Sequence, residues 1–412
     1  MTRALSELAT ADGVENVVVF VSDAMRYDFL PASVERLGVT ARAVAPSTFT
    51  ASALPSLLTG QYPATHRVWM FDDRVAERPP LLDADATDVG FDAGTVWPEL
   101  PSPEKPPLQI HHVDEERTLD ELDPPFTHVV HDVGPHAPYG FDNGVFESTK
   151  EFFREHERRR DRLVDLYRTD CERSAGRFLD LVDRLEARGI LEETLVVFTS
   201  DHGQCLGEPS RGGRFGHGHP MVPETVSVPL VFAGAGLPGG RRLDALLSGT
   251  DVVPTALAAQ RGRAPDDVDG ADVWTAPPPT DRTPRSEVWQ HLDVAAGPLE
   301  HELTVYAATS AWDAAGGHVF HRGSRLERLG ALAYDNLVRG YSPAWRHNTT
   351  VDGLVAFLSL ALGDSRTFGA PEFSAAAAAR VVPDRFDTGD PAVSDADLND
   401  RQEQRLRDLG YL

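Results

Sequence analysis

The stretch Asn16-Val-Val-Val-Phe-Val-Ser-Asp23 decides the fold of this chain. A continuous apolar run bounded by polar residues is typical of a β-strand that is buried on both faces, as in a parallel sheet. Comparable runs occur at residues 127–130, 194–198 and 228–232. The sequence therefore predicts several buried strands of one sheet.

Helical patterns separate these strands. The segment from Pro55 to Leu58 is expected to open a helix, with the proline near its first turn. Residues 151–188 are long, charged and amphipathic, which predicts one helix with an apolar stripe. Strands that alternate with helices predict an α/β fold, in which a mostly parallel central sheet is covered by helices on both faces.

A loop-like segment at residues 265–284 separates this pattern from the rest of the chain. We therefore expect a core over residues 1–263, and a smaller C-terminal subdomain over residues 264–412 that packs on it as an annex. No specificity motif is recognisable in the annex, and nothing in the sequence fixes the oligomeric state.

The chain is strongly acidic, with a formal charge of -25 and an isoelectric point near 4.9. Such a surface repels nucleic acid and anionic membranes, which argues against either as a main partner. Lysine occurs only at positions 105 and 150, and arginine supplies the other positive charges. This composition predicts a salt-adapted, halophilic protein, although a genome rich in G and C combined with an acidic fold gives the same pattern.

No stretch approaches the roughly 20 apolar residues that span a bilayer. The N-terminus also lacks the basic and apolar regions of a leader peptide. We therefore expect a soluble, cytoplasmic protein with no membrane span.

Three of the predicted strands end in side chains that can bind metal: Ser22-Asp23, His131-Asp132 and Ser200-Asp201-His202. Ligands of parallel sheets gather at the carboxyl ends of the strands. Carboxylate and imidazole groups that converge at three such ends are hard to explain as packing. The sequence therefore predicts a functional site at this edge of the sheet.

A second stretch, Thr50-Ala-Ser-Ala-Leu-Pro-Ser-Leu-Leu-Thr-Gly60, places a hydroxyl residue ten positions before a glycine. This arrangement resembles the nucleophile region of the sulfatase and alkaline phosphatase superfamily, and Asp23-Ala-Met-Arg-Tyr-Asp28 resembles the Asp-x-x-Arg-x-Asp signature of that family. The resemblance implies that Thr50 is the nucleophile, with Thr48 as the rival. Formylglycine sulfatases carry a cysteine or serine at this position, because only those residues can be oxidised to the aldehyde.

The same resemblance implies a metal site made of Asp23, Thr50, Asp201 and His202. Calcium sulfatases carry a second aspartate where this chain has Ala24. The missing carboxylate, together with the imidazole of His202, favours zinc or manganese over calcium.

A further group of candidate residues leaves two alternatives open. Asp132-Val-Gly-Pro-His136 has the Asp-x-x-x-His spacing of two-metal phosphodiesterases in the superfamily, with His217 as the third ligand and His219 as its rival. Residues 131–139 also resemble the His-x-x-x-Pro-His-x-Pro-Tyr stretch of one-metal proteins. In that case His136 and His217 contact substrate, and His66, which follows Tyr62-Pro63, faces the same pocket.

Thr50 beside an Asp/His metal set predicts a hydrolase acting on ester bonds. The leading hypothesis is a metal-dependent phosphoester hydrolase or phosphotransferase with a covalent Thr50 intermediate and one or two divalent metals. Its substrate would be a small-molecule, glycan-linked or lipid-linked phosphoester. The alternatives are a sulfuric ester hydrolase that works without formylglycine, and a binding module that has kept the fold without catalysis.

Overall fold

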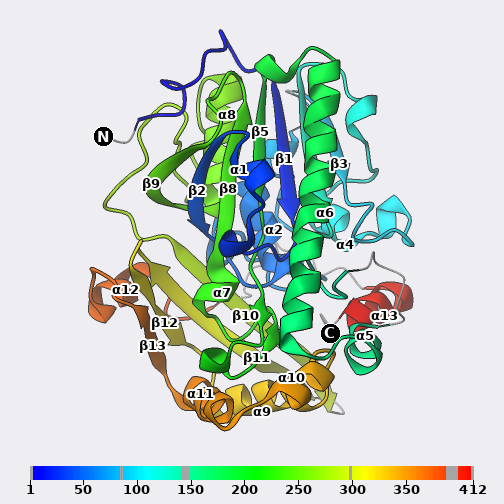
Figure 1. Ribbon diagram of the computed structural model, residues 1–412, viewed down its shortest axis with the longest axis vertical. Helices are drawn as coiled ribbons and strands as arrows, with labels where there is room; N and C mark the ends of the chain where they lie inside the picture. The colour runs from blue at the N-terminus through cyan, green and yellow to red at the C-terminus, as the bar shows by residue number, and fades with distance from the viewer. Residues whose placement is uncertain are drawn as a thin grey trace.

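A seven-stranded sheet forms the centre of the larger part of the molecule (Figure 1). The computed structural model describes residues 3–83, 85, 87–140, 148–296, 299–386 and 398–409, and all statements about the structure refer to these residues. The strands of this sheet are β1 (Asn16–Ser22), β2 (Val39–Val44), β3 (Asp88–Asp92), β4 (Phe126–Asp132), β5 (Thr194–Thr199), β8 (Ser227–Gly234) and β9 (Arg241–Ser248).

The strand order is β3-β4-β1-β5-β8-β2-β9. Neighbouring strands are parallel, except that β8 runs antiparallel to both β5 and β2. The prediction of a mostly parallel α/β sheet is therefore confirmed. Since β4, β1 and β5 are parallel neighbours, their carboxyl ends lie side by side.

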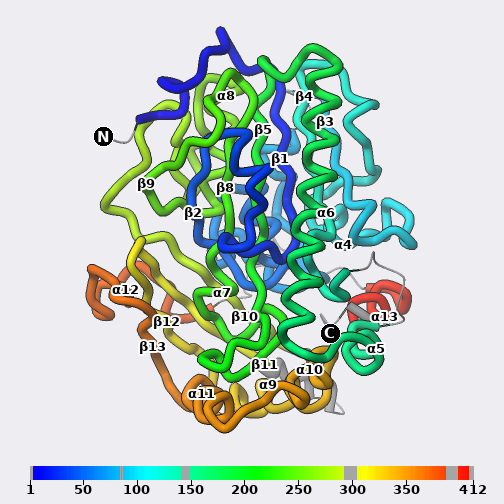
Figure 2. Tube along the Cα trace, in the orientation of Figure 1, coloured from blue at the N-terminus to red at the C-terminus, as the bar shows by residue number. Residues whose placement is uncertain are grey.

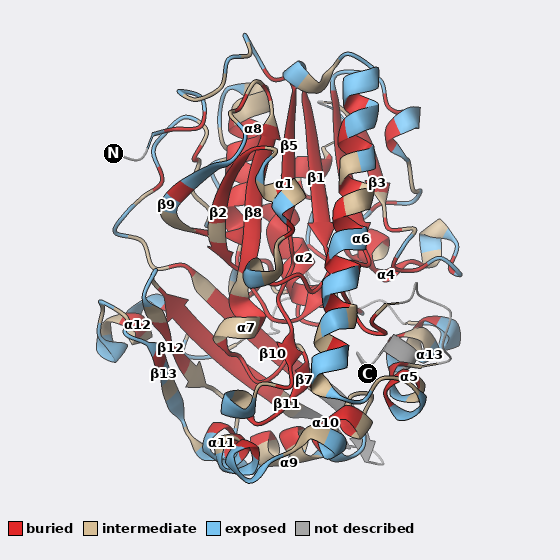
Figure 3. Cartoon of the chain, in the orientation of Figure 1, coloured by how far each residue is buried: buried red, intermediate tan, exposed pale blue. Residues whose placement is uncertain are grey.

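Helices cover both faces of this sheet, as the alternation of side chains along β1 demands. Val17, Val19 and Val21 pack in one apolar cluster with α2 (Thr50–Thr59) and α8 (Val252–Arg261). Val18 and Phe20 pack on the opposite face with α6 (Arg160–Ala187). The buried centre of the sheet is visible in Figure 3. The other helices of this part are α1 (Ala32–Glu35), α3 (Pro63–His66), α4 (Pro106–Ile110), α5 (Thr149–Glu155) and α7 (Pro223–Val226).

Two helix predictions need correction. The helix expected over residues 151–188 is divided into α5 and α6, because Asn348 accepts a hydrogen bond from the backbone N–H of Arg160 and so caps the start of α6. The helix expected to open after Pro55 begins five residues earlier, at Thr50, and accommodates the proline in its interior. This second difference matters for the site, because it places the Thr50 side chain at a helix N-terminus.

A four-stranded antiparallel sheet forms the centre of the C-terminal part. Its strands, in spatial order, are β10 (Arg285–Ala296), β11 (Leu299–Trp312), β12 (Gly316–His321) and β13 (Ser365–Gly369). The helices here are α9 (Arg325–Leu337), α10 (Ser342–Asn348), α11 (Val351–Leu362) and α12 (Ala375–Val381). A smaller C-terminal subdomain with its own sheet is therefore present, as predicted.

Two remaining features connect the parts. A two-stranded ladder of β6 (Cys205–Leu206) and β7 (Phe215–Gly216) precedes the histidine-containing loop at residues 217–219. The last helix, α13 (Asp400–Leu409), returns to the larger part and lies beside α5 (Figure 2). Among the described residues, no helix is both long enough and apolar enough to cross a bilayer.

Candidate active site

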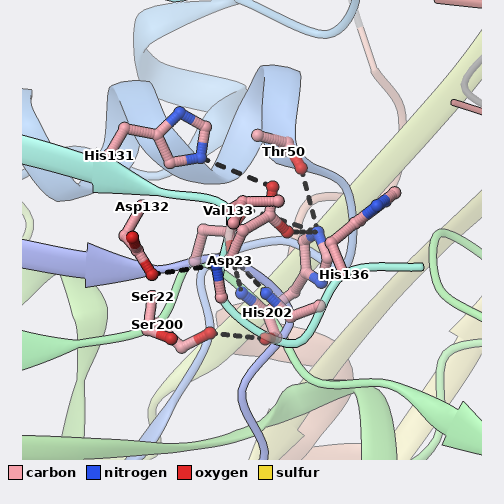
Figure 4. A network of polar contacts seen from close by, with 12 residues as sticks. Ser22, Asp23, Thr50, His131, Asp132, Val133, His136, Ser200 and His202 are labelled. Carbon is pink, nitrogen blue, oxygen red and sulfur yellow. Dashed lines mark hydrogen bonds and ion pairs between the residues drawn. The ribbon is translucent and has the colours of Figure 1, made fainter. Parts of the chain in front are cut away.

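Three ionisable side chains meet where β1, β4 and β5 end. Asp23, His131 and Asp201 each offer a ligand atom, and these atoms lie within 4.8 Å of one another. All three residues are buried. These side chains therefore lie together at the carboxyl edge of the sheet, where Figure 4 shows Asp23 and His131 beside His202 and Thr50.

The β4 residue in this cluster is His131, and not the neighbouring Asp132. Successive residues of a strand point to opposite faces of the sheet. His131 pairs in register with Val21 and shares its face with α2, whereas Asp132 faces α6. The imidazole of His131 lies 3.5 Å from the carboxylate of Asp23.

The carboxylate of Asp132 is engaged on the α6 side. It accepts hydrogen bonds from the guanidinium of Arg177, at 2.6 and 2.9 Å, and from the hydroxyl of Ser174, at 2.7 Å. The structure thus separates Asp132 from the predicted set with His136 and His217. Sequence reasoning named His131 among the metal-capable residues at the strand ends but placed only Asp132 in a ligand set, although the alternation along the strand implied that only one of the two adjacent residues could face α2.

His202 connects this cluster to Thr50. The Nε2 atom of His202 lies 3.0 Å from Thr50 Oγ1, 3.3 Å from Asp201 Oδ2 and 3.7 Å from Asp23 Oδ1. Its Nδ1 lies 3.0 Å from the carbonyl oxygen of Gly203, so we assign the ring proton to Nδ1. This assignment leaves a lone pair on Nε2 that faces the hydroxyl and the two carboxylates.

The structure therefore brings together Asp23, Thr50, Asp201 and His202, the residues of the first predicted metal site. We call Asp23, His131, Asp201 and His202 the strand-end cluster. Its side chains are at most 1% exposed.

Backbone geometry holds the carboxylates of the cluster in place. Ala24 adopts a left-handed conformation with φ of 62°, and its N–H donates to Asp201 Oδ1 at 3.1 Å. Gly134 approaches so closely that a Cβ there would lie 2.2 Å from the carbonyl oxygen of Asp23. The loop after β4 can therefore pack on Asp23 only with glycine at this position.

Burial and mutual charge set the electrostatics of the cluster, because its carboxylates and imidazoles lie against one another. Burial raises the pKa of Asp201, and the negative charge of Asp23 raises it further. Burial also opposes ionisation of Asp23, but the adjacent His136, His131 and His202 lower its pKa overall. For His131, burial is outweighed by the hydrogen bond and charge of Asp23, so its pKa is raised.

These residues fit a divalent metal ion. Carboxylate oxygens and imidazole nitrogens are the donors that zinc and manganese accept. Among the described residues, Asp201 Oδ2 has no hydrogen-bond partner, whereas Oδ1 accepts from two backbone N–H groups. A buried carboxylate oxygen is costly to leave in this state, and a cation would satisfy it.

His136 and His217 form a separate pair beside the cluster. Their Nε2 atoms lie 3.1 Å apart, and the ring of His217 stacks on that of His202 with centroids 4.1 Å apart. The Nδ1 of His136 lies 2.9 Å from the carbonyl oxygen of Ala137, so its proton is assigned there. The Nδ1 of His217 lies 3.4 Å from the carbonyl oxygen of Thr48, so the contact between the two Nε2 atoms is a hydrogen bond only when His217 carries a proton on Nε2.

Burial lowers the pKa of both members of this pair. For His217 the charges of His202 and His136 lower it further, and the pKa falls well below its usual value. The pair is therefore neutral near pH 7 when no anion is bound.

The three remaining candidates lie elsewhere. The hydroxyl of Thr48 donates to the carbonyl of Gly218 at 2.6 Å, so it is engaged away from His202. His219 is directed towards the annex, with Nδ1 2.8 Å from Gln290 and Nε2 3.0 Å from Asp335.

His66 lines a pocket with Thr65, Arg67 and Arg261 that includes none of the strand-end cluster, so its place in the substrate pocket stays a prediction. Its Nδ1 accepts from the backbone N–H of Val68 at 3.0 Å, and its Nε2 lies 2.9 Å from the hydroxyl of Ser56. Both ring nitrogens are thus used inside the protein, and burial lowers the pKa of His66 to about 3.

A small pocket lies beside His217, between the two parts of the chain. Residues from both parts line it: Phe49, His217, His219, Gln290, Asp335, Arg339, Gly340 and Tyr341. The annex therefore contributes directly to the surroundings of the candidate site.

Comparison with known proteins agrees with this architecture. The pattern of the Sulfatase family matches residues 113–261. The low-salt glycan biosynthesis sulfotransferase Agl7 of Haloferax volcanii is 42% identical to this chain over 414 aligned positions, which cover 100% of each protein.

Two solved structures share the fold at low sequence identity. A phosphonate monoester hydrolase from Silicibacter pomeroyi superposes with a TM-score of 0.53 and 17% identity, over 74% of this chain and 87% of that one. A 2-O GAG sulfatase gives a TM-score of 0.54 and 13% identity, over 75% and 83% of the two chains.

Fold and comparisons together define an α/β enzyme that acts on ester bonds. The chain belongs to the sulfatase family of the alkaline phosphatase superfamily.

Proposed function

We propose that this enzyme transfers a sulfuryl group from an ester donor to a hydroxyl group of a glycan, with Thr50 as the covalent carrier. The observation that carries the proposal is the position of Thr50 Oγ1, 3.0 Å from His202 Nε2 and at the N-terminus of α2. The name of the full-length relative, a sulfotransferase of glycan biosynthesis, supports the sulfuryl group and the glycan.

Threonine at this position suits transfer better than hydrolysis. A formylglycine hydrate has a second hydroxyl group, so its sulfated form collapses to the aldehyde and releases free sulfate. A sulfated threonine has no such route, so its sulfuryl group leaves only when a nucleophile attacks the sulfur. If an acceptor hydroxyl occupies the site in place of water, the sulfuryl group passes to the acceptor.

The proposed reaction has two half-reactions, and each conserves atoms and charge. In the first, Thr50 Oγ1 attacks the sulfur of the donor, the bond from sulfur to the donor oxygen breaks, and the donor leaves as an alcohol. In the second, the acceptor oxygen attacks the same sulfur, its bond to Thr50 breaks, and the Thr50 hydroxyl is restored. Each half-reaction moves one proton from the attacking hydroxyl to the departing oxygen.

His136 and His217 supply that proton transfer in this proposal. The pair is neutral in the free enzyme, but the negative charge of a bound sulfate ester raises the pKa of adjacent imidazoles. The pair then takes up a proton with the substrate and gives it to the departing oxygen, and the proton lost by the attacking hydroxyl returns to the pair, so each half-reaction leaves the pair's charge unchanged. In this proposal both histidines contact the substrate and neither binds metal, so the site holds one metal ion and not two.

We propose that Asp23, His131, Asp201 and His202 hold one zinc or manganese ion, with Thr50 beside it. When bound, such an ion would neutralise charge on the transferred group and lower the pKa of the Thr50 hydroxyl. The strand-end cluster offers carboxylate and imidazole donors, which are ligand types that zinc and manganese accept, and this supports the proposed ion.

A second candidate function is phosphoester hydrolysis or phosphoryl transfer through the same Thr50. The observation in its favour is the nucleophile itself, because a hydroxyl group beside metal-binding carboxylates and imidazoles serves phosphorus as well as sulfur.

The deciding experiment compares nitrophenyl sulfate with nitrophenyl phosphate mono- and diesters as donors, with and without a sugar acceptor, in the presence of zinc or manganese. We expect sulfated sugar as the product, and a sulfuryl group on Thr50 by mass spectrometry when acceptor is omitted. Release of phosphate in preference to sulfate would support the second candidate. Equal transfer by the Thr50→Ala variant would refute the covalent role in both.

We also propose that residues 1–263 form the catalytic core and residues 264–412 an annex that shapes the substrate pocket. The contribution of Gln290, Asp335 and Tyr341 to the pocket beside His217 supports this division.

A further inference from the structure

Exposed apolar side chains are concentrated in one region of the annex. Ten large apolar side chains are exposed among the described residues, and nine of them lie on α9, on α11 or directly after α9. Three are exposed by more than 60%, namely Leu326 at 82%, Val351 at 77% and Val355 at 63%. The others in this region are Tyr334, Leu337, Val338, Leu354, Leu358 and Leu362. Figure 3 shows both helices at the lower end of the molecule.

Helix α11 is unusual because it is apolar on both sides. Its inward side carries Phe357, Leu360 and Ala361, as expected for a helix that packs on a protein. Its outward side is apolar as well, and Asp352 is the single charged residue in its twelve. A helix that is hydrophobic all round is expected inside a protein or in contact with lipid.

The two helices form one continuous surface. Leu329 and Leu332 of α9 pack with Phe357 and Ala361 of α11, which holds the helices together. We call the exposed residues on these helices, with Val338, the α9–α11 face. Apolar surface of this extent is a mark of an interaction site.

The charge around this face differs from that of the whole chain. Residues 321–369 contain six arginines and four carboxylates, a net charge of +2, whereas the chain carries -25. Arg325 and Arg346 are exposed there, and Arg325 is ion-paired with Asp364. Charges are screened beyond about 10 Å at ordinary ionic strength, so a surface touching this face meets mainly the local positive charge.

The face also adjoins the candidate active site. Val338 belongs to the face, and the next residues, Arg339, Gly340 and Tyr341, line the pocket beside His217. Whatever the face rests on is therefore brought close to the entrance of that pocket.

We propose that the α9–α11 face docks on the surface of a lipid bilayer, with the two helices lying in the plane of the headgroups. Apolar residues on the outward side and arginines around them are the composition of such interfacial helices. A second copy of the chain is a poorer occupant, because two like faces would bring together equal local charges. Docking presents the pocket beside His217 to molecules held at the membrane, and it does not depend on the chemistry proposed for Thr50.

The test is flotation of the full-length protein with vesicles of phosphatidylcholine, alone and mixed with phosphatidylglycerol. We expect wild-type protein to float with the vesicles, and more of it when anionic lipid is present. The triple variant Leu326→Asp, Val351→Asp and Val355→Asp should lose roughly ten-fold or more of the bound fraction. These positions are exposed, so thermal unfolding of the variant should match that of wild type.

Val381→Asp is the matched control, because Val381 is the tenth exposed apolar residue and lies on α12, outside the face. It should bind vesicles as wild type does. The proposal is wrong if wild-type protein fails to float with either vesicle, or if the control variant loses binding equally. It is also wrong if sedimentation shows a dimer that the triple variant dissociates while vesicles bind neither protein. Since the readout is binding, these outcomes are independent of any measured activity.

Discussion

The strand-end cluster and the α9–α11 face both depart from the usual arrangement, in which charged side chains are exposed and apolar side chains are buried. The cluster buries two carboxylates and two imidazoles with at most 1% of each side chain exposed, whereas the face leaves Leu326 and Val351 more than three-quarters exposed. Buried charge and exposed apolar surface both raise the free energy of the isolated chain. Under the two proposals made above, each region is completed by something outside the chain, a cation in one case and a lipid surface in the other.

The largest effect is expected at Thr50. Thr50→Ala removes the proposed carrier, so turnover with nitrophenyl sulfate should fall by about a thousand-fold or more. Thr50→Ser keeps a hydroxyl group at the same place and should retain measurable turnover. Steady-state kinetics with matched metal content check this, and activity of the alanine variant near that of wild type would contradict the assignment.

The second-largest effect should distinguish the roles of His131 and Asp132, which are adjacent on β4. His131→Ala removes a proposed metal ligand, so metal affinity should fall by more than about a hundred-fold. Loss of a residue that only hydrogen-bonds to a ligand usually lowers metal affinity by less than this. Asp132→Asn weakens the bond to Arg177 on the other face, so it should lower stability by about 2 kcal/mol with less effect on metal affinity. Metal titration and denaturant unfolding of both variants measure this. The reverse pattern would restore the prediction made from sequence.

Glu287 is a buried carboxyl group like those of the strand-end cluster, but its neighbour is the guanidinium of Arg285. Burial raises the pKa of Glu287 from 4.5 to about 7, although Arg285 lies 3.2 Å away. Because the folded-state pKa is raised, the stabilisation is complete below pH 4.5 and is lost as the pH rises through about 7. This corresponds to about 3 kcal/mol. In Glu287→Gln, whose amide cannot ionise, this loss should be absent when unfolding free energies are compared from pH 4.5 to 8.

The smallest effect on catalysis is expected at His66. His66→Ala breaks two buried hydrogen bonds and should lower the unfolding free energy by about 1–3 kcal/mol. The Michaelis constant for a sulfate ester should stay unchanged, because both ring nitrogens are engaged by Ser56 and Val68 and His66 lines a pocket apart from the strand-end cluster. A raised Michaelis constant with unchanged stability would return His66 to the substrate pocket.

Much of the fold follows from local sequence. The apolar run before Asp23 predicts a strand buried on both faces, and the alternation with helical segments predicts a mostly parallel sheet. The positions of Asp23, Asp201 and His202 follow as well, because parallel strands bring their carboxyl ends to one edge. The division at residue 263 and the salt-adapted surface stay predictions.

Other features needed the three-dimensional arrangement. Which of His131 and Asp132 faces α2 depends on the register of β4 beside β1, and a motif spacing does not contain that register. The break between α5 and α6 depends on Asn348, which is far away in the sequence. The hydrogen bonds of His66 come from nearby residues, Val68 and Ser56, but the bond to Ser56 depends on how α3 packs against α2.

By itself the sequence determined the class of fold, the edge of the sheet where the chemistry gathers, and the threonine that replaces a formylglycine precursor. These follow from periodicity and residue type, which act locally. Only the tertiary structure decided which ligands share a face, that His136 pairs with His217, and that two annex helices expose apolar residues beside the pocket. Such features depend on contacts between segments far apart in the chain, and a linear pattern does not specify the distances between them.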